Sequence, residues 1–204
     1  IDIAGEEKGI VPSPSWKEKE IGEQWYLGDT YNYGIGQGYL LTTPLQVNVM
    51  TGVFANGGTL YKPHLVSSQK KILKKDFIKK EYLELVRKGM RQSCETGGVA
   101  WPFFNFKVKN ERLPVDNQDY IEEASPAIGG ASGSARFVRI PVACKTGTAE
   151  VADKEKDPLA WITVFAPFYE PEIVLTVLVE NGGEGSSVAG PIAKKILQDY
   201  FERK

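Results

Sequence analysis

The final third of the chain carries three runs that favour β-strands: FVRIPVACKTGTAEV at 137–151, LAWITVFAPF at 159–168 and EIVLTVLVE at 172–180. Short turn-forming segments separate the runs, which predicts strands that follow one another in an antiparallel sheet. The second and third runs are apolar on both alternating faces, which is typical of strands in the middle of a sheet covered on both sides.

Helices are expected on either side of this strand-rich region. One should begin at Thr43, whose side chain can cap it, with Pro44 in the first helical position and Gln46 completing a capping box. The Asn-Gly-Gly sequence at 56–58 should end that helix. The sequence therefore predicts one α/β unit of the α+β kind over residues 1–204, an antiparallel sheet flanked by helices.

Two further helices are predicted from apolar spacing. The first should run from Asp76, as its cap, to about Ser93, and the second from about Val188 to Phe201. Their expected inward faces are Ile78, Tyr82, Leu85, Val86 and Met90 in the first, and Ile192, Ile196 and Tyr200 in the second.

The remaining stretches have little periodicity. Residues 1–42 are rich in Gly, Pro and aromatic residues and are expected to be ordered but irregular, and 61–73 should be a short extended or hairpin segment. A surface excursion is expected at 100–137. Its opening Trp-Pro-Phe-Phe sequence at 101–104 can either pack on the domain or bind a partner.

Composition excludes several classes of protein. The 25 basic and 26 acidic residues nearly balance, which argues against a nucleic-acid-binding protein. One His and two Cys exclude a His-based metal cluster and a multi-Cys zinc site. No apolar run reaches the ~18–20 residues that cross a bilayer, and the start of the chain lacks both a signal peptide and an initiator Met. We therefore expect that the gene begins upstream of Ile1.

The sharpest motif is Lys145-Thr146-Gly147-Thr148, which lies on a predicted strand. Lys145 would supply positive charge for a substrate carboxylate, and the two threonines would add hydroxyl donors. Gly147 removes a side chain, so that substrate can lie against the strand edge. The Thr148 backbone N–H could provide one half of an oxyanion hole.

This motif and others in the same order resemble class B penicillin-binding proteins, most closely the elongation-type D,D-transpeptidase. The motifs are GIGQGYLLTTPLQ at 34–46, FANGG at 54–58, YKPHL at 61–65, GMR at 89–91, KTGTAE at 145–150 and FAP at 165–167, together with PSPSW at 12–16 and WYLGDT at 25–30. The resemblance implies a penicillin-binding protein/serine β-lactamase-like transpeptidase fold. It implies that Lys145, Thr146, Gly147 and Thr148 bind substrate, with Lys145 and the Thr148 N–H acting in catalysis.

The resemblance also implies what this chain lacks. The family's nucleophilic Ser-x-x-Lys and its Ser-x-Asn motif lie upstream of the Gly-Gln-Gly segment, and no Ser-x-Asn occurs in this sequence. Ser67 and Ser68 each precede a lysine by three residues, but they lie downstream of that segment, so we interpret both matches as coincidence. The chain is therefore expected to be the C-terminal part of a transpeptidase domain, inactive alone, and to need the missing N-terminal part of that domain.

The implied activity is the cross-linking of peptidoglycan stem peptides through a serine acyl-enzyme, which β-lactams block. The implied location is the external face of the bacterial cytoplasmic membrane, with the elongation machinery and its glycosyltransferase as partners, and without nucleic acid, metal or organic cofactor. Two alternatives stay open: a β-lactam sensor or inactive penicillin-binding module, and a β-lactamase or D,D-carboxypeptidase.

Cysteine pairing is undecided by the sequence. Cys144 stands where the family commonly has Gly, and strand alternation points its side chain away from the face of Lys145. A buried thiol is one interpretation, and a disulfide with Cys94 in an oxidising compartment is the other, because the sequence does not give their separation.

Overall fold

The computed structural model describes residues 4–66, 70–116, 118–123, 136–151 and 155–204. Its main sheet is antiparallel throughout, in the order β6 (Ala143–Ala149), β7 (Leu159–Ala166) and β8 (Ile173–Val179). These strands match the three predicted runs, except at the start of the first. Pro141 cannot donate a ladder hydrogen bond, and β5 (Phe137–Arg139) before it leaves for a second sheet.

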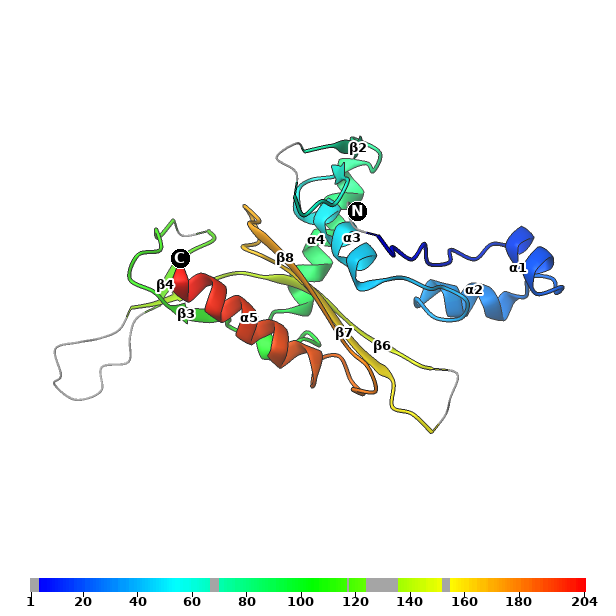
Figure 1. Cartoon of the computed structure of the whole chain (residues 1–204). Coiled ribbons are helices and arrows are strands. Elements are labelled where there is room, and N and C mark those ends of the chain that lie inside the picture. The colour runs from blue at the N-terminus through cyan, green and yellow to red at the C-terminus, as the bar shows by residue number, and fades with distance from the viewer. Residues whose placement is uncertain (1–3, 67–69, 117, 124–135, 152–154) are drawn as a thin grey trace.

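Helices cover both faces of the main sheet, as predicted (Figure 1). On one face lie α3 (Pro44–Ala55), which contacts β7 and β8, and α4 (Lys80–Ser93), which contacts β6. On the other face, α5 (Ala189–Arg203) contacts β7 and β8. The predicted capping box of α3 is confirmed, because Gln46 N–H donates to Thr43 Oγ1 and Thr43 N–H donates to Gln46 Oε1.

The inward face predicted for the last helix is wrong. Ile192, Ile196 and Tyr200 are 42%, 41% and 38% exposed, whereas the stripe one residue later is buried. That buried stripe consists of Ala189, Ala193, Leu197 and Phe201. One residue turns a helix by about 100°, and the small residues of the second stripe allow the helix to approach the sheet more closely than two isoleucines would.

The start predicted for the second helix is also wrong. The helix begins at Lys80, and Asp76 lies before it with a left-handed φ of 54°, so it does not cap the helix. Met90 is buried as predicted, together with Leu83, whereas Tyr82, Leu85 and Val86, which were also predicted to face inward, are exposed. The apolar spacing around 76–82 is compatible with a helix. The hairpin of β1 (Leu60–Tyr61) and β2 (Ile72–Lys74) ends just before these residues, so the first of them connect the hairpin to the helix.

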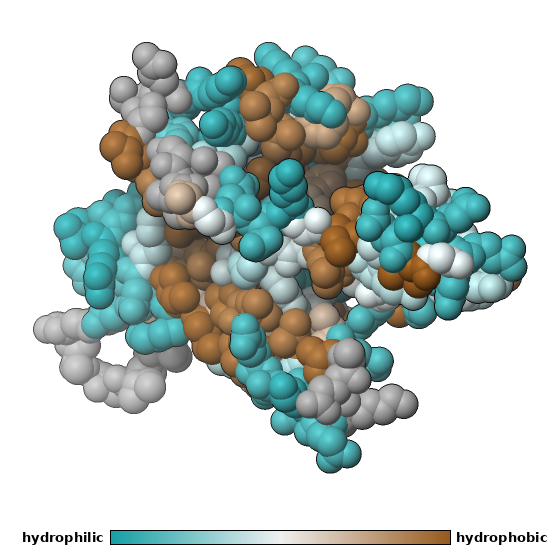
Figure 2. All heavy atoms as spheres, turned by 45° about the vertical axis from the view of Figure 1, so that its right-hand side comes forward, coloured by the Kyte–Doolittle hydropathy of each residue, from teal (hydrophilic) through white to brown (hydrophobic). Residues whose placement is uncertain are grey.

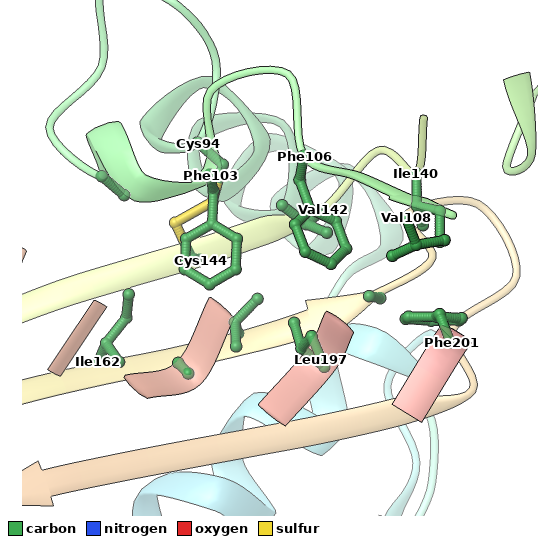
Figure 3. Packing of buried hydrophobic residues seen from close by; sticks show 14 of the residues in the cluster. Cys94, Phe103, Phe106, Val108, Ile140, Val142, Cys144, Ile162, Leu197 and Phe201 are labelled. Carbon is green, nitrogen blue, oxygen red and sulfur yellow. A yellow bond between two sulfur atoms is a disulfide. The ribbon is translucent and has the colours of Figure 1, made fainter. Parts of the chain in front are cut away.

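The described part of the expected excursion at 100–137 is built into the core. It contains η1 (Trp101–Phe103), β3 (Lys107–Lys109) and β4 (Ile121–Glu123), and the second sheet has the order β3-β5-β4. Phe103, Phe106 and Val108 lie on the α5 face of the main sheet, close to Leu197 and Phe201 (Figure 3). The 101–104 segment therefore packs on the domain, with Phe103 1% exposed. Residues 124–135 lie outside the described residues.

Residues 4–42 form an arm that runs out from the body (Figure 1). It contains two short helices that were not predicted, α1 (Pro14–Glu20) and α2 (Leu27–Gly34). The two helices are joined by Lys17, which is 3% exposed and pairs with Asp29 at 2.8 Å.

The Arg87 side chain joins three parts of the α3 face. Its guanidinium donates to the carbonyls of Phe54 and Ala55, at the end of α3, and to the carbonyl of Phe168 after β7. It also lies 5.1 Å from the ring centroids of both Phe165 and Phe168. These contacts hold α4 against the end of α3, and α4 in turn lies against β6.

The two cysteines form a disulfide between α4 and the sheet. Cys94, the C-cap of α4, and Cys144, on β6, have Cα atoms 6.0 Å apart, and their side chains lie in the core (Figure 3). Of the two interpretations that the sequence left open, a buried thiol and a disulfide with Cys94, the structure shows the disulfide. The bond closes a loop with a sequence separation of 50 residues.

Reduction of this disulfide is expected to lower the free energy of unfolding by about 3–4 kcal/mol, because a 50-residue loop regains its freedom in the unfolded state. Thermal unfolding of the full-length protein with and without a thiol reductant measures the effect. In the Cys94→Ser/Cys144→Ser double variant the reductant should change nothing. An equal shift in the variant and the parent would contradict the assignment.

The main sheet ends at β8, which has no further strand on its outer side among the described residues. All seven residues of β8 are partly exposed, and six of them are apolar. Apolar side chains also gather into patches on the surface seen in Figure 2. An apolar edge strand is a template for pairing with another chain, and large apolar patches promote association.

We therefore expect the isolated 204-residue chain to self-associate. Light scattering coupled to size-exclusion chromatography should give a mass above the 22.6 kDa monomer that rises with concentration. A monomer that melts cooperatively at every concentration would contradict this expectation.

Candidate active site

The Lys145–Thr148 motif occupies the middle of β6, which is an edge strand of the main sheet among the described residues. Pairing with β7 places Lys145 opposite Thr163 and Gly147 opposite Trp161. The sheet thus brings the four residues predicted from the sequence to one edge, with one side of the strand bonded to β7 and the other facing away from the sheet.

Strand alternation divides the side chains of β6 between two faces. Cys144 is fully buried in the core on the α5 side, so Lys145 and Gly147 lie on the opposite, α3 side. Lys145 is exposed, and its Nζ donates to the Thr146 carbonyl. The predicted separation of Cys144 from the face of Lys145 is confirmed.

Three hydroxyl groups lie close together beside Lys145. Thr163, its partner on β7, donates from Oγ1 to Thr51 Oγ1 at 2.8 Å and shares a 2.9 Å hydrogen bond with Thr176 Oγ1. Thr51 and Thr163 are 1% and 6% exposed, and their hydroxyls satisfy each other in this buried position. This bond fixes α3 to β7, the central strand of the sheet, which pairs with the motif strand β6.

The Gly-Gln-Gly turn contacts the motif from the arm. Gln37 Nε2 donates to the Thr148 carbonyl at 3.1 Å, across 111 positions of sequence. In an antiparallel ladder the N–H and C=O of one residue point to the same side. Because the Thr148 carbonyl receives a donor from outside the sheet, the Thr148 N–H also faces outward, as a group that binds an oxyanion must.

A cleft of about 530 Å³ lies between the arm, α3, α4 and the motif strand. Its polar wall contains Lys145, Thr146, Gly147, Thr148 and Gln37. Its apolar lining comes from the two helices, the arm and β7, and the helices contribute Val47, Met50, Phe54, Val86 and Met90. A concave site with an apolar wall and a few convergent polar groups is the usual form of a ligand-binding site.

The glycine of the motif lies in a closely packed position. A Cβ on Gly147 would lie 3.2 Å from Trp161 Cβ. The loop after β8 approaches the same point from the other face, where a Cβ on Gly185 would lie 2.4 Å from the Gly147 carbonyl oxygen and 2.3 Å from that of Trp161. The Gly185 N–H donates to Thr148 Oγ1 at 3.4 Å, so this hydroxyl accepts a hydrogen bond from the loop.

Several features of the site were not found from the sequence. The contact of Gln37 with Thr148, the Thr51–Thr163 bond and the approach of Gly185 all join residues far apart in the chain. The order of the motifs was the one signal that pointed to the Gly-Gln-Gly turn. Ser67 and Ser68, whose matches to Ser-x-x-Lys we interpret as coincidence, lie outside the described residues.

Within the described part of the chain, no cluster of three or more His, Cys, Asp or Glu residues could hold a metal ion. The same residues include no helix with both the length and the apolar character that a bilayer span requires.

Substitution Gly185→Ala is expected to destabilise the protein by about 1–3 kcal/mol, because the new methyl group meets backbone atoms of both β6 and β7 and forces them to move. The matched control is Gly89→Ala on α4, where a Cβ meets nothing within 4 Å. That change should be neutral or stabilising. Thermal unfolding of the two variants tests the difference, and equal midpoints would show that the loop does not press on the motif strand.

Comparison with known proteins agrees with this geometry. The family model of the penicillin binding protein transpeptidase domain matches residues 1–198. The chain is 31% identical to the peptidoglycan D,D-transpeptidase MrdA of Haemophilus influenzae over 204 residues, and 30% identical to the MrdA of Escherichia coli K12 over 208 residues. These matches cover 100% and 97% of this chain, and 30% of each relative.

Solved structures agree as well. The penicillin-binding protein 2 in a complex with MreC from Helicobacter pylori superposes with a TM-score of 0.72 at 32% identity, covering 98% of this chain and 32% of that one. The Pseudomonas aeruginosa penicillin-binding protein 2 in complex with WCK 5153 gives a TM-score of 0.68 at 29% identity, covering 98% and 40%. The chain thus spans less than a third of the curated relatives' length. It belongs to the penicillin-binding protein transpeptidase domain family, as a class B domain of the penicillin-binding protein 2 type.

Proposed function

We propose that this chain is the substrate-holding part of a peptidoglycan D,D-transpeptidase of the MrdA type. The observation that carries the proposal is the motif strand. Lys145 and the outward-facing Thr148 N–H lie on one sheet edge, at the wall of a cleft of about 530 Å³. A cation beside an outward N–H suits an acyl donor that has a terminal carboxylate and a carbonyl under attack.

The proposed reaction is acyl transfer through a serine. A nucleophilic serine, supplied by the missing N-terminal part of the same domain, attacks the penultimate D-alanyl carbonyl of a D-alanyl-D-alanine stem peptide. The C–N bond breaks, the terminal D-alanine leaves with a proton on its nitrogen, and an ester to the serine remains. An amine of a second stem peptide then attacks this ester, forms the cross-linking amide and releases the serine.

In this scheme the residues of this chain position and stabilise charge. Lys145 holds the terminal carboxylate of the donor, with Thr146 beside it, and Gly147 leaves room for the donor against the strand edge. The Thr148 N–H donates to the oxygen that becomes negative when the serine attacks, and loss of one such donor typically costs about 2.7–4 kcal/mol of transition-state stabilisation. β-Lactams would acylate the same serine because they present a similar carboxylate and a reactive carbonyl.

The wider setting is proposed from the same family membership. We place the whole protein at the external face of the bacterial cytoplasmic membrane, where its peptidoglycan substrate lies. Partners would come from the elongation machinery, including its glycosyltransferase. The Helicobacter pylori relative, which was solved in a complex with MreC, supports this kind of assembly.

Two other functions make different predictions. A β-lactam sensor or inactive module would bind penicillin without turning over peptide donors. A β-lactamase or D,D-carboxypeptidase would release its acyl group to water rapidly. The names of the MrdA relatives favour the transpeptidase.

Intact-mass analysis after incubation with benzylpenicillin tests the proposal. The full-length protein should gain the mass of one penicillin and keep it for many minutes, and this chain alone should gain none. Lys145→Met should slow acylation of the full-length protein by at least about tenfold, because a charge-assisted contact to the carboxylate is lost.

The matched control is Lys195→Met on α5, whose lysine is 71% exposed and lies away from the cleft. Rapid loss of the adduct would favour the hydrolase. A stoichiometric adduct on the isolated chain would contradict the proposal that the nucleophilic serine lies outside this chain. Peptide mapping would then examine Ser67 and Ser68 first.

A further inference from the structure

Gln37 occupies a hydrogen-bonding position that the proposed acyl donor also needs. Its amide donates to the Thr148 carbonyl at 3.1 Å from the side of the strand that faces away from β7. The same residue, Thr148, presents the N–H that the proposed function assigns to the oxyanion. The two groups of Thr148 lie side by side on the open edge of β6.

The geometry of an antiparallel pair links these two groups. Opposed residues in a hydrogen-bonded pair exchange both bonds, each donating its N–H to the carbonyl of the other. A donor residue whose reacting carbonyl accepts from the Thr148 N–H therefore directs its own N–H toward the Thr148 carbonyl. That carbonyl is the acceptor of the Gln37 amide.

The backbone of Gln37 is fixed, whereas the contact made by its side chain is exposed. The flanking Gly36 and Gly38 have left-handed φ values of 78° and 74°, and the Gln37 N–H donates to the Asn32 carbonyl at 2.8 Å. A Cβ at Gly38 would lie 3.3 Å from Asn32 Cβ, so the turn is closely packed on α2. The Gln37–Thr148 bond itself is exposed, so the side chain can rotate away without disturbing the turn.

We propose that Gln37 is a substrate-positioning residue that holds the Thr148 carbonyl and gives it up to the backbone N–H of the acyl donor. This inference rests on the proposed transpeptidase function and adds to it a competition between the Gln37 amide and the backbone N–H of the donor. A donor with an N–H at the residue under attack replaces the bond that Gln37 loses. A donor without this N–H gains no hydrogen bond at the Thr148 carbonyl, and the Gln37–Thr148 bond stays in place when it binds.

The sharpest test compares two thioester donors that differ in one atom. An N-acyl-D-alanyl thioester has the N–H, and the matching O-acyl-D-lactyl thioester has an ester oxygen in its place. The measured quantity is the ratio of their kcat/KM values in the full-length protein. In Gln37→Met, a side chain of similar length without a donor, the amide donor meets no competitor, so the ratio in favour of the alanyl donor should rise roughly two- to tenfold.

Gln37→Glu should move the ratio in the same direction, because a carboxylate does not donate to the carbonyl. Any general loss of binding in either variant affects both thioesters and cancels in the ratio. The matched control is Gln24→Met, at an exposed position on the same arm, which should leave the ratio unchanged.

The outcomes separate the two proposals. If the parent protein turns over the donors and the Gln37 variants keep its ratio, or lower it, Gln37 does not compete for the carbonyl and this inference is wrong while the transpeptidase function stands. If the parent protein turns over neither thioester and is not acylated by penicillin, the proposed function fails, and this inference fails with it.

Discussion

The one-sided pairing of β6 with β7 is the constraint on which the site depends. Seven consecutive residue pairs hold β6 in register, so Cys144 enters the core and Lys145 leaves it. The same pairing leaves the N–H and C=O of Thr148 free to face outward. A strand hydrogen-bonded to neighbours on both edges would have no free N–H and C=O groups. An edge strand without further contacts would not hold these groups in a fixed direction. Contacts of β6 with α4 and the disulfide to Cys94 anchor the strand, and the Thr51–Thr163 bond fixes its partner strand β7 to α3.

The sequence predicted the parts of this structure that depend on local chemistry. The capping box at Thr43 and Gln46 is such a case, as are the three strands, because each signal lies within a few residues. The buried face of α5 was not predicted correctly because two stripes of apolar residues have the same helical spacing. The stripe that contains Ala193 packs against the sheet, and the stripe that contains Ile192 is exposed. The buried Phe103 and Phe106 lie in a stretch without periodicity, where burial follows from distant partners.

The candidate site was predictable to a similar degree. Lys145–Thr148 could be named from the motif and its strand context, and the structure brings these residues to one edge. The role of Gln37 could not be found in this way, since its bond to Thr148 spans 111 positions. The apolar wall of the cleft was also hidden, because Met50 and Val86 belong to separate helices. Such juxtapositions are properties of the tertiary fold, which local patterns do not encode.

The central claim is that this chain binds the carboxylate and stabilises the oxyanion of an acyl donor whose serine partner comes from elsewhere in the protein. A crystal structure of the full-length protein acylated by benzylpenicillin tests it most directly. We expect the ester carbonyl oxygen about 3 Å from the Thr148 backbone nitrogen, and the penicillin carboxylate beside Lys145. An acyl group whose carbonyl and carboxylate both point away from β6 would contradict the account.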